Sequence, residues 1–204
     1  MNKESYRTLA GEFRHEIEKV KGSRFLAAVA PTRNEDEAQE LVSRQRKEFH
    51  DARHHCSAWR FGRTGQEFRY SDDGEPSGSA GKPILQAIDG RELCDVTVVV
   101  TRYFGGTKLG VGGLVRAYGG AAAEALDRAE IIVVTLKRRF RLKYSYECSG
   151  PIQGLLNEFE FDPTRAEYGA EVELELEIPL KLCDAFLREF TERTAGRGEC
   201  RELT

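Results

Sequence analysis

The sequence lacks several features that would place a protein in a familiar class. Its five cysteines are odd in number and include no C-x-x-C pair, so neither a disulfide framework nor a structural zinc site is expected. No apolar run approaches the length of a transmembrane helix, and the N-terminal residues carry charges throughout instead of an apolar signal segment. We therefore expect a protein of the reducing cytoplasm with no membrane attachment.

An excess of positive charge is also lacking. The formal net charge is -3; residues 1–135 hold 20 basic and 20 acidic residues, and residues 136–204 hold 11 basic and 14 acidic residues. A general basic field for nucleic acid is therefore excluded, and any site for an anion must be local. Hydrophobic residues make up 40% of the chain, which is enough for a folded core.

The hydrophobic periodicity predicts an α+β protein with two domains, residues 1–135 and 136–204. In the first domain we expect a sheet backed by helices, with strands near 19–30, 57–61, 95–103 and 131–135, helices near 35–53, 82–89 and 114–129, and a polar loop over 63–81. Asn34 is the predicted N-cap of the first helix. The second domain has the β-α-β-β-α-β order of a ferredoxin-like fold. Its strand near 171–178 alternates apolar residues with glutamates, which predicts one buried and one solvated face.

A glycine-rich segment follows the valine-rich strand and leads into the alanine-rich helix. Glycines allow the backbone to approach a ligand, and the free N–H groups of a helix start favour an anion. The phosphate-loop pattern G-x-x-x-x-G-K-[ST] is absent, so close strand–helix packing also explains the glycines. The candidate nucleic-acid or anion-binding residues are Arg102, Tyr103, Gly105, Gly106, Lys108, Gly110, Gly112, Gly113, Arg116 and Tyr118.

An acidic cluster precedes the second helix. Asp72, Asp73 and Glu75 could hold Mg²⁺, but their spacing is not that of a calcium loop, and carboxylates are common in turns and helix caps. We therefore assign no metal and no cofactor, and we name no catalytic residue. His54 and His55 precede Cys56, and these residue types can bind a metal. Successive residues of a strand face opposite sides, however, so we do not expect the three side chains to converge on one site.

Taken together, these segments resemble the IMPACT family in its bacterial YigZ-like branch. The similarity rests on the segments HHCSAW from His54, DDGEPSGSAGKPI from Asp72, RYFGGTKLG from Arg102 and GLVRAY from Gly113. One departure is Ser79, where the family pattern implies Thr. The resemblance implies an N-terminal domain like the second domain of a small-subunit ribosomal protein. It implies a C-terminal domain like the last domain of elongation factor G.

The resemblance also carries a functional expectation. Eukaryotic members regulate translation by competing for the large activator of the amino-acid-starvation kinase, and contact with nucleic acid or the ribosome is the usual suggestion for bacterial members. Two hypotheses stand. One is a binding protein that contacts RNA, the ribosome or a translation-machinery partner through the glycine-rich loop. The other is a hydrolase or transferase of a phosphate-containing substrate that uses Asp72, Asp73 and Glu75. The sequence does not specify the oligomeric state.

Overall fold

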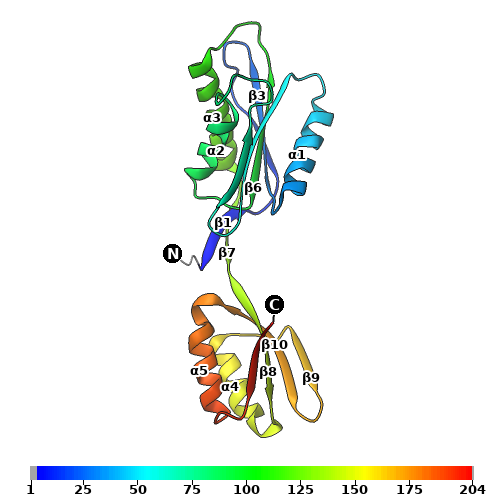
Figure 1. Cartoon of the computed structure of the whole chain (residues 1–204), viewed down its shortest axis with the longest axis vertical. Helices are drawn as coiled ribbons and strands as arrows, with labels where there is room; N and C mark the ends of the chain where they lie inside the picture. Colours follow the sequence, from blue (N-terminus) through cyan, green and yellow to red (C-terminus); the bar gives the residue numbers. More distant parts are fainter. Residues whose placement is uncertain (1–3, 204) are drawn as a thin grey trace. The chain divides into compact units, whose positions relative to one another are not determined.

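A computed structural model describes residues 4–203 of the chain. The fold is α+β, as predicted, and the chain divides into two compact units between Val134 and Thr135. The first unit contains a five-stranded sheet and a two-stranded sheet, and the second contains a four-stranded sheet (Figure 1). No helix among the described residues combines the length and apolar character needed to cross a membrane.

The five-stranded sheet of the first unit is antiparallel and has the order β2-β3-β6-β4-β5. Its strands are β2 (Phe13–Glu16), β3 (Arg24–Pro31), β4 (His54–Phe61), β5 (Glu67–Ser71) and β6 (Val96–Tyr103). The separate pair consists of β1 (Ser5–Leu9) and β7 (Ile131–Thr135). The central strand β6 is buried along almost its whole length, which explains its continuous valine-rich sequence.

Helices cover both faces of this sheet (Figure 1). The helices α2 (Gly81–Asp89) and α3 (Val111–Arg128) pack on one face, where Phe25, Ile84 and Leu126 belong to the main core. The helix α1 (Glu35–Glu48) lies on the other face over a smaller cluster formed by Ala30, Leu41, Val42 and Val99. The predicted N-cap is confirmed, because the side chain of Asn34 accepts the Glu37 N–H at 2.9 Å.

Several predicted boundaries are wrong. The strands β1 and β2 were not expected, and the predicted loop over 63–81 contains β5, whose five residues are all exposed. The strand β4 begins at His54 rather than Ser57, and α1 ends at Glu48 rather than near Arg53. The edge strands β2 and β5 have no fully buried residue, so burial leaves little mark on their sequences.

The second unit has the predicted β-α-β-β-α-β order, and its sheet order β11-β8-β10-β9 is that of a ferredoxin-like fold. Its elements are β8 (Lys137–Tyr144), α4 (Ser149–Phe159), β9 (Arg165–Tyr168), β10 (Val172–Pro179), α5 (Cys183–Arg193) and β11 (Glu199–Leu203). On β10 the residues Val172, Leu174, Leu176 and Ile178 are buried in the core beneath both helices, as the alternation predicted.

Candidate anion-binding site

The glycine-rich loop ends in an open helix start. Gly110 precedes α3 with φ of 72°, a backbone conformation that favours glycine, and no side chain caps the helix. The first backbone bond of this helix is donated by Leu114 to the Gly110 carbonyl at 2.9 Å. The N–H groups of Val111, Gly112 and Gly113 have no hydrogen-bond partner within residues 4–203, and the first turn contains no acidic residue. An anion at this helix start could therefore accept hydrogen bonds from the free N–H groups, and the helix dipole would favour its negative charge.

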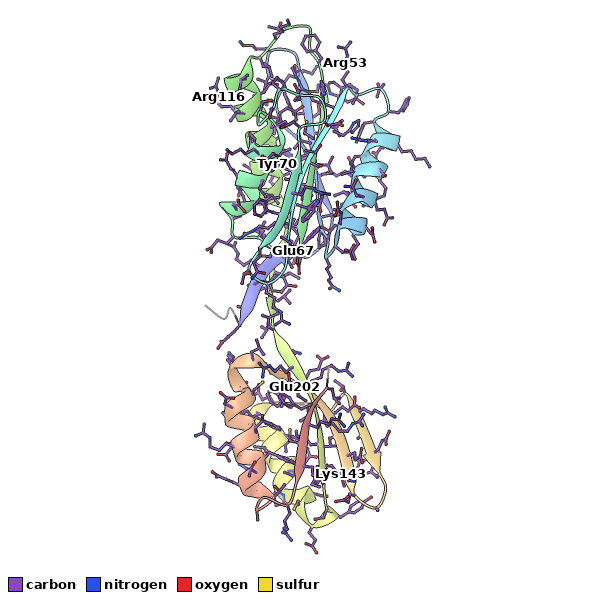
Figure 2. The ribbon with its side chains drawn as sticks, in the orientation of Figure 1. Arg53, Glu67, Tyr70, Arg116, Lys143 and Glu202 are labelled. Atoms are coloured by element: carbon purple, nitrogen blue, oxygen red, sulfur yellow. The ribbon has the colours of Figure 1, made fainter. Side chains whose placement is uncertain are left out.

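Two cations lie beside this helix start. Lys108 precedes it in the loop and Arg116 lies just after its first turn, and both are exposed. Neither side chain forms an ion pair or hydrogen bond with any residue that the structure describes. A third exposed cation, Arg53, lies at the same end of the unit as Arg116 (Figure 2). The positive charge expected from the sequence is thus available at Lys108 and Arg116.

The rest of the loop is held by close backbone packing. A Cβ on Gly105 would lie 1.9 Å from the carbonyl carbon of Gly22, so no other residue fits at this position without moving the backbone. The Gly105 N–H donates to the Ser23 hydroxyl at 3.1 Å. Gly105 therefore serves the packing of two loops, which is the structural explanation that the sequence left open.

The predicted surface roles of Arg102 and Tyr118 are wrong. The Arg102 guanidinium donates to Glu75 Oε1 at 2.6 Å, and the Tyr118 hydroxyl donates to the same oxygen at 2.8 Å. Only 6% of the Arg102 side chain and 5% of the Glu75 side chain are exposed, and Tyr118 is fully buried. These groups form a buried polar cluster beneath the loop, so neither Arg102 nor Tyr118 can reach a ligand at the surface.

The aromatic residue at the surface here is Phe104, which the sequence analysis did not single out. This residue is 43% exposed, and the Arg102 guanidinium lies 5.6 Å from the centroid of its ring. Tyr103 is partly buried and already has partners within the protein. Its hydroxyl donates to Asp51 at 2.7 Å, and the Arg24 guanidinium lies 5.2 Å from its ring centroid. The available signal was that Phe104 stands between a buried strand and a glycine pair, where a large side chain has little core to enter.

The three carboxylates of the acidic cluster bind different partners. Asp72 accepts the N–H groups of Gly78, Ala80 and Gly81 at 2.8 to 3.0 Å, so it fixes the turn before α2 and the start of that helix. Asp73 accepts the His55 N–H and a bond from the Arg46 guanidinium, both at 2.6 Å. Together with the Glu75 bonds described above, these contacts occupy all three carboxylates within the protein.

Comparison with known proteins places this geometry in a family. Residues 21–126 match the family described as "Impact N-terminal domain", and this match spans β3 to α3 with both the acidic cluster and the glycine-rich loop. The chain belongs to the IMPACT family. Residues 142–197 match a second family, described as "Domain of unknown function (DUF1949)".

Whole-chain relatives in the IMPACT family agree with this assignment. The chain is 38% identical to the IMPACT family member YvyE of Bacillus subtilis, over 97% of this chain and 91% of the relative. It is 38% identical to the IMPACT family member YigZ of Escherichia coli, over 88% of this chain and 89% of the relative. A crystal structure described as that of a hypothetical protein matches 98% of both chains with a TM-score of 0.70 at 34% identity.

The buried cluster of this IMPACT family member also includes the His54 and Cys56 side chains. The His54 Nδ1 lies 2.8 Å from the Asp73 carbonyl oxygen, and its Nε2 lies 4.0 Å from Glu75 Oε1. The Cys56 thiol donates to the Asp72 carbonyl at 3.1 Å, and burial raises the pKa of this thiol to about 12. Burial also raises the pKa of Tyr118 far above its ordinary value. Both groups therefore stay protonated at neutral pH, and Cys56 is not an activated nucleophile.

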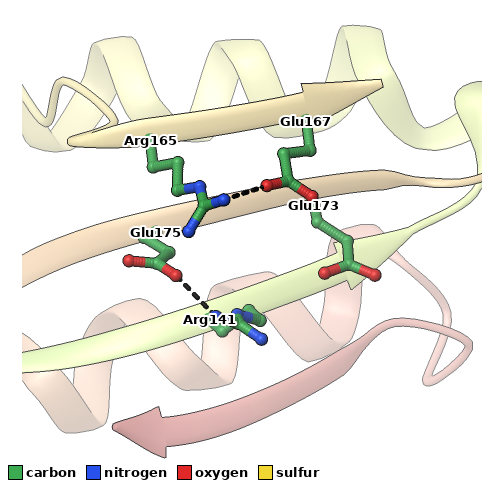
Figure 3. A pocket seen from close by; sticks show the side chains of 5 residues that line it. All are labelled: Arg141, Arg165, Glu167, Glu173 and Glu175. Carbon is green, nitrogen blue, oxygen red and sulfur yellow. Dashed lines mark hydrogen bonds and ion pairs between the residues drawn. The ribbon is translucent and has the colours of Figure 1, made fainter. Parts of the chain in front are cut away.

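The second unit contributes a sheet face covered by paired charges. On this face Glu175 accepts from the Arg141 guanidinium at 2.6 Å, and Arg165 pairs with Glu167 of the same strand at 2.5 Å. These four residues line an open cavity of about 200 Å³ (Figure 3). The bond from Arg141 lowers the pKa of Glu175 below its ordinary value. Because these cations and carboxylates satisfy one another, the face has little free charge for a phosphate.

Proposed function

We propose that this IMPACT family protein is a translation-linked binding protein that contacts RNA through the start of α3. In this proposal a phosphate accepts hydrogen bonds from the N–H groups of Val111, Gly112 and Gly113. Lys108 and Arg116 supply the positive charge. The observation that carries the proposal is the combination of an uncapped helix start with two exposed cations that have no partner among the described residues.

The exposed ring of Phe104 favours RNA over a phosphorylated protein as the source of the phosphate. Single-stranded RNA is recognised largely by stacking of bases on aromatic rings next to cations that bind the backbone. Phe104 lies 43% exposed in the same loop as Lys108. A translation-machinery protein that binds without RNA is the alternative partner, and the experiment below distinguishes the two.

The enzymatic hypothesis has weaker support from the geometry. A phosphate-substrate hydrolase or transferase would use Asp72, Asp73 and Glu75 as metal ligands or as general acids and bases. Here Asp72 holds the start of α2, Asp73 binds Arg46 and the His55 N–H, and Glu75 binds Arg102 and Tyr118. Each carboxylate would have to break these bonds before it could act on a substrate.

The test is a double substitution of the two cations. We expect Lys108→Ala/Arg116→Ala to weaken binding of a single-stranded RNA at least about tenfold in fluorescence anisotropy, with the melting temperature unchanged, because both side chains are exposed. With two phosphates neutralised, the log–log salt slope of the wild-type protein on single-stranded RNA should be about -1 to -2.

A matched control is Arg33→Ala/Arg63→Ala. It removes the same charge from exposed residues that follow β3 and β4, at the end of the sheet opposite to the loop. If the two double variants bind RNA equally well, the proposed site is wrong. If co-sedimentation with ribosomes depends on Lys108 and Arg116 but free RNA does not bind, the partner is a protein of the translation machinery.

A further inference from the structure

The strand β5 presents an open edge on the five-stranded sheet. The sheet order places β5 at the end of the ladder, hydrogen-bonded to β4 on one side only. All five of its residues are exposed, including 57% of Phe68 and 43% of Tyr70. Figure 2 labels Glu67 and Tyr70, which lie toward the two ends of this strand. An open edge of this kind offers unpaired N–H and C=O groups to another strand.

The side chains of β5 separate by chemistry onto the two faces of the sheet. Phe68 and Tyr70 pair with Arg60 and Ala58 of β4, and Ala58 belongs to the core under α2 and α3. Glu67 and Arg69 therefore lie on the other face, which α1 covers. One face of the edge is thus aromatic, and the other carries one acidic and one basic residue two positions apart.

This arrangement is self-complementary in one antiparallel register. If two copies of β5 pair about a two-fold axis through Phe68, Glu67 of each copy lies opposite Arg69 of the other, and the two Phe68 rings lie side by side. An axis through Glu67 or Arg69 would place two like charges directly opposite each other, which is destabilising. The charges therefore favour the register centred on Phe68 and disfavour the two adjacent registers, centred on Glu67 and Arg69.

We propose that β5 pairs antiparallel with β5 of a second copy of this chain, centred on Phe68, so that the two five-stranded sheets become continuous. Arg69 now forms an ion pair with Glu35, and both side chains are about half exposed or more. Because an exposed ion pair is weak, Arg69 can exchange Glu35 for Glu67 of the second copy. Such an isologous contact buries the Phe68 rings and completes the hydrogen bonding of both edges. The proposal does not depend on RNA binding at the start of α3.

The first test uses charge reversal on the full-length chain in sedimentation velocity. Glu67→Arg and Arg69→Glu each place like charges opposite in the homodimer, so each should raise the dimer dissociation constant at least about tenfold. An equimolar mixture of the two variants pairs opposite charges again and should dimerise like the wild type. The double variant Glu67→Arg/Arg69→Glu should also dimerise. Circular dichroism checks that every variant is folded.

The second test traps the register by disulfide formation. Phe68→Cys in a Cys200→Ser background places two thiols opposite each other and should give a covalent dimer on mild oxidation, since the other cysteines are buried. Tyr146→Cys, an exposed site in the second unit, is the matched control and should stay monomeric. A wild-type chain that remains monomeric at high concentration, a dimer insensitive to either charge reversal, or equal cross-linking at positions 68 and 146 would each overturn the proposal.

Discussion

The Arg102 guanidinium and the Glu75 carboxylate form an ion pair 2.6 Å long with both side chains about nineteen-twentieths buried. Glu75 belongs to the turn before α2, whereas Arg102 lies near the end of β6. The same guanidinium lies 3.4 Å from the Ser23 hydroxyl, which accepts the Gly105 N–H. This one arginine therefore links the acidic turn, the start of β3 and the glycine-rich loop.

We expect Arg102→Ala to lower the free energy of unfolding by about 3 kcal/mol or more, because it leaves the buried Glu75 charge without its partner. Urea denaturation followed by the fluorescence of Trp59 measures this, since Trp59 is the only tryptophan and lies in β4 of the same unit. RNA binding should weaken only to the extent that the substitution disorders the glycine-rich loop.

A double-mutant cycle separates the pair from the rest of the cluster. Arg102→Leu/Glu75→Gln removes both charges and should cost less than the sum of the two single changes, because neither charge is then left unpaired. Additive effects would contradict a direct coupling between the two residues. Unchanged stability of Arg102→Ala with lost RNA affinity would instead return Arg102 to the binding surface.

The sequence singled out Arg102, Tyr118 and Glu75 as candidate residues but did not predict that they contact one another. The glycine loop, the valine strand and the following helix could be recognised because packing imposes strong periodicity on them. The pairing of Arg102 with Glu75 joins residues 27 positions apart in the chain, which only the tertiary fold brings together. An arginine next to glycines has the same composition whether it points toward solvent or into the core, so the sequence could not distinguish the two.

The same limit applies to Asp72, whose role depends on the fold of its own turn. Its carboxylate accepts three backbone N–H groups at the start of α2. We expect Asp72→Ala to lower the free energy of unfolding by about 1 to 3 kcal/mol, the range for loss of a helix cap with charged hydrogen bonds. Asp72→Asn keeps one carbonyl oxygen and should cost less.

The matched control for this change is Asp89→Ala, at the other end of the same helix. Asp89 is half exposed and lies 3.4 Å from the Arg60 guanidinium, so its loss should cost below about 1 kcal/mol. Equal losses in the two alanine variants would show that Asp72 acts only through its general charge. A loss of RNA binding in Asp72→Ala with full stability would support the enzymatic or metal-binding reading of the acidic cluster.

The edge strands show a second reason why sequence patterns fail. The strand β5 has the sequence EFRYS, whose two aromatic residues alternate with charges, yet none of the five residues is buried. Its position is fixed by hydrogen bonds to β4 rather than by burial. The alternation was visible, but the surrounding glycines and acidic residues indicated a loop. The inner strands were predictable because burial, and not only pairing, determines their composition.

Alkaline pH should unfold the first unit through its buried acids. The Cys56 thiol has an ordinary pKa of 9.0, which burial raises to about 12 in the folded protein. Below pH 9 the thiol is protonated in both states, so it contributes no pH dependence. Between pH 9 and pH 12 the unfolded chain releases a proton that the native state retains, and stability falls by up to about 1.4 kcal/mol per pH unit for each such group. Tyr6, whose pKa is also raised to about 12, adds to the effect.

Cys56→Ala is the change that tests this account. Urea midpoints measured from pH 7 to pH 11 should decline less steeply above pH 9 in Cys56→Ala than in the wild type, because the titrating thiol is gone. Tyr146→Phe serves as the control, since Tyr146 is 51% exposed in the other unit. Its profile, followed by Trp59 fluorescence, should match the wild type. Parallel declines in Cys56→Ala and the wild type would show that the Cys56 thiol is not desolvated in the folded protein, and that the buried cluster beneath the loop is open to water.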